Sequence, residues 1–170
     1  ESTIKDGEIY AAKTGEVSID KKRREIEIET HQEHDRKTVK VGDILLGETV
    51  FMRKHSVGII YYSINGKIHF NSSNLGNIHI SQVSNKYVDK LRDAFQKTDI
   101  IRTKVLEKET NEFNLTTKGK NLGVIHADCA ICGYKLEKIG YDKLRCPRCG
   151  NMEKRKLARD YGDPEVKLRF

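Results

Sequence analysis

Short runs in which apolar and polar residues alternate occupy the first part of the chain and predict strands. The clearest run is residues 24–30, where charged and apolar side chains alternate as in a half-buried strand. Three strands are expected here, over residues 8–12, 15–19 and 24–30. Residues 31–38 are polar throughout and predict a linker. We therefore expect a small β-domain over residues 1–38, shortened at its start because the chain begins with Glu1 instead of Met.

A second series of apolar runs predicts a β-barrel over residues 39–118. Its expected strands cover residues 44–52, 56–62, 67–70, 76–80, 100–106 and 113–117. Asn65-Gly66 lies between two of these runs and suits a type I′ hairpin turn. Residues 87–95 predict the one short helix, with Tyr87, Val88, Leu91 and Phe95 on one face. Five or six strands with a helix before the fourth main strand indicate a small closed Greek-key barrel.

The third segment, residues 119–170, holds all four cysteines of the chain. Cys129 and Cys132 form one CxxC pair followed by Gly133, and Cys146 and Cys149 form a second pair followed by Gly150. This spacing lets two tight turns supply four thiolates to a single ion, typically Zn²⁺ in a closed, structural Cys₄ site. Because the segment has few apolar residues, we expect zinc to hold it together, so that chelation unfolds residues 119–159 and leaves the barrel largely intact.

Other interpretations of the cysteines are weaker. Disulfides need an oxidising compartment, and no export signal is visible. A redox CxxC is expected once, within a βαβ pattern that is absent here. An iron centre with four cysteine ligands is not distinguished from zinc by spacing, and zinc is the favoured ion.

Most of the positive charge lies beside these cysteines. The net charge of the chain is +7, and residues 129–159 contain nine Lys or Arg against three Asp or Glu. Four thiolates with one Zn²⁺ lower the resulting +6 to about +4. A basic patch this local indicates an anionic partner, with nucleic acid favoured over a merely solvated basic surface.

Several function classes are excluded or disfavoured. No apolar run approaches the roughly 18 residues of a membrane span, so a cytoplasmic protein without a membrane partner is expected. No phosphate-binding loop, nucleotide fingerprint or partnered nucleophile is visible, so no catalytic residue is proposed and an enzyme is not expected.

The motifs together resemble a known family. The runs around Gly42-Asp43, Gly76–Ser81, 101–105 and Asn114–Thr117 resemble successive strands of an S1 RNA-binding domain, which implies an OB-type barrel. Residues 123–133 with 146–150 resemble a zinc ribbon. A small β-domain, an S1 barrel and a zinc ribbon in this order resemble the Csl-type RNA-binding cap subunits of the archaeal exosome. The resemblance implies a mainly β fold and a non-catalytic subunit in RNA degradation and 3′-end processing.

The same resemblance implies the partners. These are the RNase PH-like subunits of the exosome ring, the other cap subunit, a DnaG-type primase-like protein and single-stranded RNA. The alternative is a free-standing zinc-ribbon and OB-fold factor in transcription or translation.

Candidate RNA-binding residues are basic or lie where S1 domains contact RNA. They are Arg53, Lys54 and His55 in a loop, His79 on the third strand, and Arg102 and Lys104, which alternate outwards on a later strand. Val57 and Ile60 stand where S1 domains that bind RNA strongly have aromatic residues. We therefore expect weak, charge-driven RNA binding by the barrel.

Overall fold

The computed structural model describes residues 2–5, 8–11, 16–21, 25–29, 39–68, 74–109 and 112–163. The chain forms two compact units, residues 1–38 and 39–170. In the first unit, β1 (Ser2–Lys5) pairs with β2 (Glu8–Ala11), and β3 (Glu16–Asp20) pairs with β4 (Glu25–Glu29), both in antiparallel register. The three predicted strands are therefore present, and β1 adds a fourth. The predicted linker over residues 31–38 lies outside the described part of the chain.

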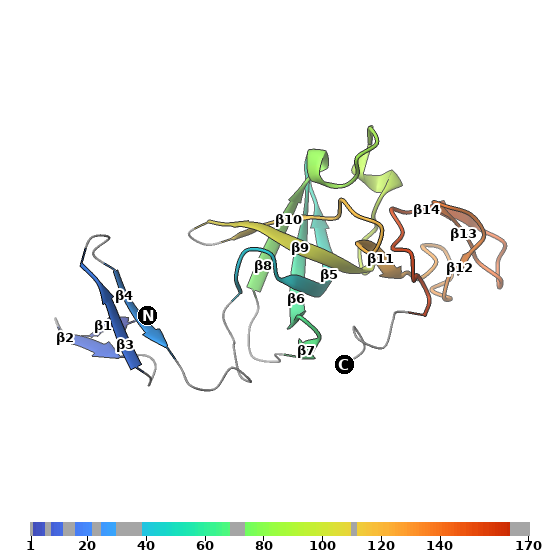
Figure 1. The fold of residues 1–170 in the computed structure, drawn as a ribbon. Coiled ribbons are helices and arrows are strands. Elements are labelled where there is room, and N and C mark those ends of the chain that lie inside the picture. Colours follow the sequence, from blue (N-terminus) through green and yellow to red (C-terminus); the bar gives the residue numbers. More distant parts are fainter. Residues whose placement is uncertain are drawn as a thin grey trace. The chain divides into compact units, whose positions relative to one another are not determined.

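The second unit contains a closed barrel of five strands (Figure 1). They are β5 (Ile44–Met52), β6 (Ser56–Ile64), β8 (Asn74–His79), β9 (Ile100–Lys108) and β10 (Phe113–Thr116). Around the barrel the order is β5-β6-β8-β10-β9, and β9 pairs back with β5. The β8–β10 contact is parallel and all others are antiparallel. This arrangement confirms the mainly β class and the OB-type barrel.

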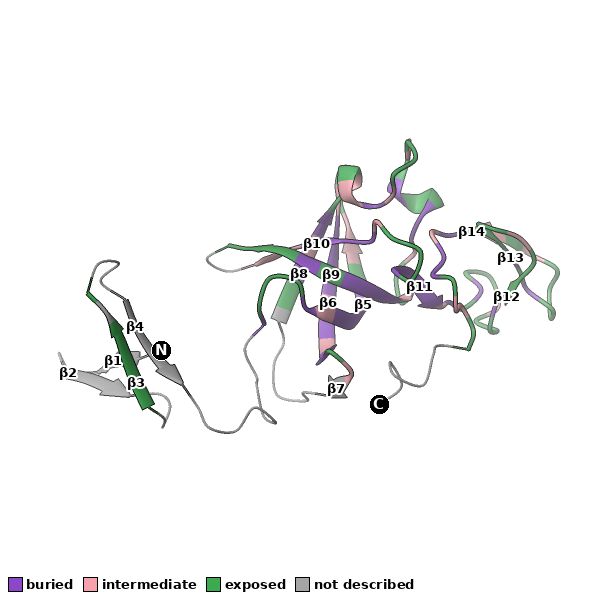
Figure 2. Ribbon diagram, in the orientation of Figure 1, coloured by how far each residue is buried: buried purple, intermediate pink, exposed green. Residues whose placement is uncertain are grey.

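Side-chain alternation along the strands fills the barrel interior. On β6, Val57, Ile59 and Tyr61 point inwards and are almost fully buried. The short strand β7 (Lys67–Ile68) pairs with β6, and Asn65 and Gly66 form the connecting turn with φ angles of 50° and 83°. Figure 2 shows the buried residues concentrated on the barrel strands.

The predicted helix over residues 87–95 is wrong. The structure has only a 3₁₀ turn, η3 (Leu91–Asp93), and Lys90 before it is extended. Leu91 and Phe95 are buried as expected, but Tyr87 is 91% exposed. A nine-residue helix has too few backbone hydrogen bonds to persist unless its apolar face is buried as a whole, and here only part of that face reaches the core.

The cysteine-bearing segment is joined to the barrel by backbone and core. Strand β11 (Gly123–His126) pairs with the first residues of β9, and the Val124 N–H donates to the Lys156 carbonyl over 2.8 Å. A three-stranded antiparallel sheet follows, made of β12 (Glu137–Lys138), β13 (Lys143–Arg145) and β14 (Met152–Lys154). Leu136 and Leu144 belong to the same hydrophobic core as the barrel residues. The predicted boundary between residues 118 and 119 thus falls inside the second compact unit.

Candidate metal centre and nucleic-acid interface

Two tight turns carry the four cysteines. In each turn the glycine after the second cysteine, Gly133 or Gly150, has a positive φ (68° and 76°) and its N–H donates over 2.9 Å to the carbonyl of the first cysteine. Backbone N–H groups of Ile131 and Cys132 donate to the Cys129 sulfur. The glycines are therefore needed for a turn that points its N–H groups at the sulfurs.

The four sulfur atoms converge on one point. They lie within 4.8 Å of one another, and the Cys129–Cys149 and Cys132–Cys146 sulfur pairs are 3.6 and 3.4 Å apart. Sulfurs at about 2.3 Å from a common tetrahedral centre are about 3.8 Å apart. The donor set therefore fits a four-coordinate ion with no open position. Burial raises the pKa of Cys129, but N–H donors including the Asn151 amide outweigh it and lower this pKa to about 7.

A second layer of polar groups supports the cysteine turns. The Asn151 amide lies 3.6 Å from the Cys129 sulfur and donates to a Glu153 carboxylate oxygen over 2.8 Å. The same oxygen accepts the Ala130 N–H over 2.9 Å. Glu153 thus ties the first cysteine turn to β14.

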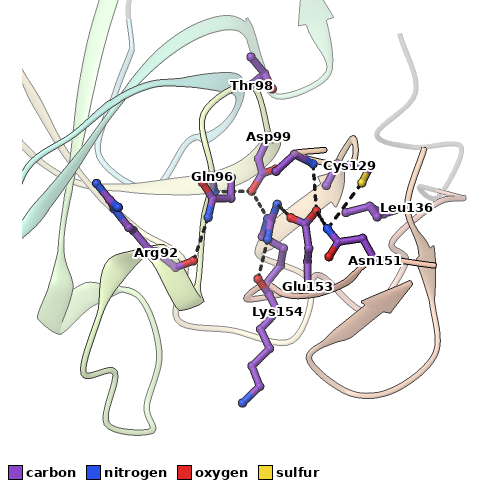
Figure 3. A network of polar contacts seen from close by, with 12 residues as sticks. Arg92, Gln96, Thr98, Asp99, Cys129, Leu136, Asn151, Glu153 and Lys154 are labelled. Carbon is purple, nitrogen blue, oxygen red and sulfur yellow. Dashed lines mark hydrogen bonds and ion pairs between the residues drawn. The ribbon is translucent and has the colours of Figure 1, made fainter. Parts of the chain in front are cut away.

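This layer continues into the barrel through a buried arginine. Arg155 donates to the second Glu153 oxygen over 2.6 Å and to the Asp99 carboxylate over 2.7 Å. The side chains of Arg155 and Asp99 are each only 1% exposed. Burial raises the pKa of Asp99 to about 6, against the lowering effect of Arg155 and the Gln96 N–H. Figure 3 shows these contacts running from Asp99 to Asn151 and Cys129.

A second buried ion pair overturns one prediction. Arg102 does not face outwards: its side chain is 3% exposed and makes two hydrogen bonds, of 3.0 and 2.9 Å, with the Asp160 carboxylate. It also donates to the Asn121 carbonyl over 2.8 Å. The alternation of side chains along β9 predicts an outward Arg102, but β11 packs beside this part of the strand. Arg102 holds the two parts of the second unit together and is not available to RNA.

The structure brings four other predicted residues together. Arg53, Lys54 and His55 are exposed in the turn between β5 and β6. The Ile80 N–H, next to His79, donates to the His55 carbonyl over 2.8 Å. His79 is exposed and its ring accepts the Ser81 N–H at the start of η2 (Ile80–Gln82), so it also has a local capping role. Lys104 is exposed but pairs with Ile44 at the far end of β5, about 30 Å along the chain from Arg53.

One aromatic residue of this surface was missed. Phe51, half-buried on β5, lies opposite Gly58 on β6, and a Cβ atom at Gly58 would come within 2.1 Å of its ring. The Arg53 guanidinium lies 5.1 Å from the ring centroid. Val57 points into the core and Ile60 is half-buried. Phe51 therefore supplies an aromatic ring to the surface on which the sequence placed Val57 and Ile60. Its pairing with Gly58 depends on a bulged register, which the alternation pattern does not reveal.

Comparison with known proteins identifies the family. No model of a protein family matches the chain. The Exosome complex component Csl4 of Archaeoglobus fulgidus is 33% identical over 161 residues, which are 94% of this chain and 85% of the relative. The chain belongs to the Csl4 family of exosome components. The resemblance seen in the sequence is therefore confirmed.

Solved structures give weaker likenesses. The intact α subunit of aIF2 from Pyrococcus abyssi is 16% identical, with a TM-score of 0.41 over 49% of this chain and 30% of that one. A protein assigned as an exosome complex RNA-binding protein is 20% identical, with a TM-score of 0.41 over 56% of this chain and 52% of its own. The family assignment rests on the Csl4 relative alone.

Proposed function

We propose that the chain is a non-catalytic, RNA-binding cap subunit of an exosome, which guides RNA to the degradation and tailing chamber of an RNase PH-like ring. The family relationship over nearly the whole chain carries this proposal. The closed OB-type barrel and the Cys₄ centre support it. A free-standing factor in transcription or translation is not favoured, because the relationship extends beyond the barrel and the ribbon.

The barrel contributes the RNA contact through one end. Arg53 and Lys54 supply positive charge, and Phe51 with the guanidinium above it supplies a flat surface on which an unpaired base can stack. His55 and His79 lie beside them, and Lys104 is a separate, more distant contact. With few cations and one aromatic ring, binding is weak and falls steeply with salt.

The first unit and the ribbon serve the assembly of the exosome. In the first unit Val17 and Ile19 on β3 are 57% and 60% exposed, which suits docking on the ring. The cysteines hold one structural Zn²⁺, which stabilises the ribbon. The ribbon recruits the DnaG-type protein, and the other cap subunit occupies the same ring. No helix in the described residues could span a membrane, and we place the protein in the cytoplasm.

RNA binding by the barrel is tested with variants of Phe51 and its neighbours. Phe51→Leu should weaken binding of a fluorescent oligouridylate about tenfold, because an aliphatic side chain cannot replace base stacking. Phe51→Tyr should retain affinity. Arg53→Gln with Lys54→Gln should lower the slope of log affinity against log salt by about 1.4, as expected for two lost phosphate contacts. Equal affinity of F51L and F51Y would place the stacking contact elsewhere.

Ring association is tested by mixing the full chain with ring subunits. Co-elution in size-exclusion chromatography at a fixed stoichiometry is expected. Replacing Val17 and Ile19 by Ser should abolish it while leaving RNA affinity unchanged, because the two contacts lie in different units. A wild-type chain that never co-elutes with such a ring contradicts the proposed function.

A further inference from the structure

The three-stranded sheet of the ribbon has one face that points to solvent. Glu137 pairs with Arg145, Arg145 with Met152, and Lys143 with Lys154, so these side chains share a face. All five are exposed. The other face carries Leu144, which is fully buried, and Glu153, which is bound by Arg155. Figure 3 shows the Lys154 side chain extending away from that buried network.

Two cations of this outer face, Lys143 and Lys154, have no acidic residue opposite them. Within the described part of the chain, Lys143, Arg145 and Lys154 make no ion pair. Lys143 lies directly opposite Lys154, and like charges opposite each other on antiparallel strands are destabilising. The buried arginines of the same unit, Arg102 and Arg155, are by contrast fully paired. The sheet therefore carries a charge arrangement that an anionic partner would relieve.

An exposed aromatic ring lies next to these cations. Tyr141, in the turn between β12 and β13, is 80% exposed, and the Lys86 ammonium lies 5.1 Å from the centroid of its ring. Tyr141 and Lys154 line the same hollow between the ribbon and the loop before η3. A flat ring beside cations is the combination with which proteins hold unpaired bases and their phosphates.

We propose that the outer face of the ribbon sheet, formed by Lys143, Arg145 and Lys154 with Tyr141 at its edge, is a second binding surface for single-stranded RNA. The choice of RNA rests on the proposed RNA-binding function. Lys143 and Arg145 are about 6.7 Å apart along β13, comparable with successive phosphates of an extended strand. Glu137 lies opposite Arg145 only, so Lys143 and Lys154 form the most cationic part of this face.

The neighbouring hollow itself is less suited to RNA. Asp89, Asp93 and Asp142 line it together with the lysines, so an RNA backbone inside it would meet carboxylates. The strand is therefore expected to cross the sheet face and to place a base on Tyr141 at the rim. The exposed Ile139 and Met152 would also suit an acidic protein segment, which the experiment separates from RNA.

The test compares two charge-matched double variants of the full chain. Lys143→Gln with Lys154→Gln should lower the salt slope of oligouridylate binding by about 1.4 and weaken binding about fivefold. Lys97→Gln with Lys120→Gln, at two exposed positions that are not part of this sheet, should change neither. The probe is a fluorescent strand of about 20 nucleotides, longer than one OB-fold site of about 4–16 nucleotides, followed by anisotropy between about 50 and 200 mM salt.

Two further measurements distinguish a lost RNA contact from a loss of folded structure. The K143Q/K154Q variant should unfold at the wild-type temperature or above it, because the change removes repulsion, so lost affinity is not lost structure. Tyr141→Ala should weaken binding about tenfold, whereas Tyr141→Phe should not.

The outcomes that overturn the proposal are separate from those that overturn the proposed function. If K143Q/K154Q binds RNA with the same salt slope as K97Q/K120Q while R53Q/K54Q is weakened, the ribbon face is not an RNA surface and an acidic protein becomes the class of partner to seek. If the wild-type chain binds no RNA at all, this proposal and the RNA-binding function both fail.

Discussion

Replacing Arg155 by methionine is expected to lower the free energy of unfolding of the second unit by about 3–5 kcal/mol. The change leaves the Asp99 carboxylate buried without its cation and frees one oxygen of Glu153. The chain has no Trp, and six of its seven Tyr lie in residues 39–170. Urea unfolding followed by tyrosine fluorescence therefore measures mainly the second unit.

A second variant shows whether the lost pair is the cause. Asp99→Leu combined with Arg155→Met should recover most of the stability, because removing both charges avoids a buried ion without a partner. Arg159→Met, at an exposed arginine of the same segment, should change the free energy of unfolding by less than about 0.5 kcal/mol. An R155M variant as stable as R159M would show that the Asp99–Arg155 pair contributes nothing measurable.

Loss of the metal is expected to weaken the barrel as well as the ribbon. Cysteine-bound zinc contributes roughly 10–16 kcal/mol of apparent binding energy in small isolated sites. Here Cys129, Cys146 and the ribbon leucines share a core with the barrel. Cys146→Ser or complete chelation should therefore lower the unfolding temperature of the whole second unit by about 10 °C or more.

The metal experiment has its own controls. A chromogenic chelator should release one Zn²⁺ per chain, and adding zinc back should restore the unfolding temperature of chelated wild type but not of C146S. Amide hydrogen exchange should increase on β9 as well as on the ribbon strands, because β11 pairs with β9. Unchanged protection of β9 in metal-free protein would mean that the barrel is independent of the ribbon, as the sequence alone suggested.

The features that the sequence predicted correctly are those set by residues close to one another in the chain. Each cysteine turn is complete within five residues, so its pairing and its glycine could be recognised without knowing the fold. The barrel strands follow from alternation, and Asn65-Gly66 marks its turn. The residues that join barrel and ribbon were not predictable in this way. Arg102 binds Asp160, which is 58 positions away, and nothing near either residue indicates the other.

The helix and the aromatic contact failed for related reasons. The spacing of Tyr87, Leu91 and Phe95 fits a helix, but only two of the three side chains reach the core, so burial does not support the full length. Phe51 meets Gly58 because β5 and β6 change register between Thr49 and Phe51. Such shifts depend on how a closed sheet accommodates its curvature, which no single strand encodes.

The shared edge of β9 also has a consequence for synthesis of the protein. On one side β9 pairs with β5, and on the other it pairs with both β10 and β11. Strand β11 in turn forms further backbone hydrogen bonds with Lys156, Ala158 and Gly162. The growing chain therefore cannot complete the edge of its barrel until residue 162 has left the ribosome. Because contacts this distant in sequence form slowly, the unfinished edge of β9 is the segment for which protection during translation matters most.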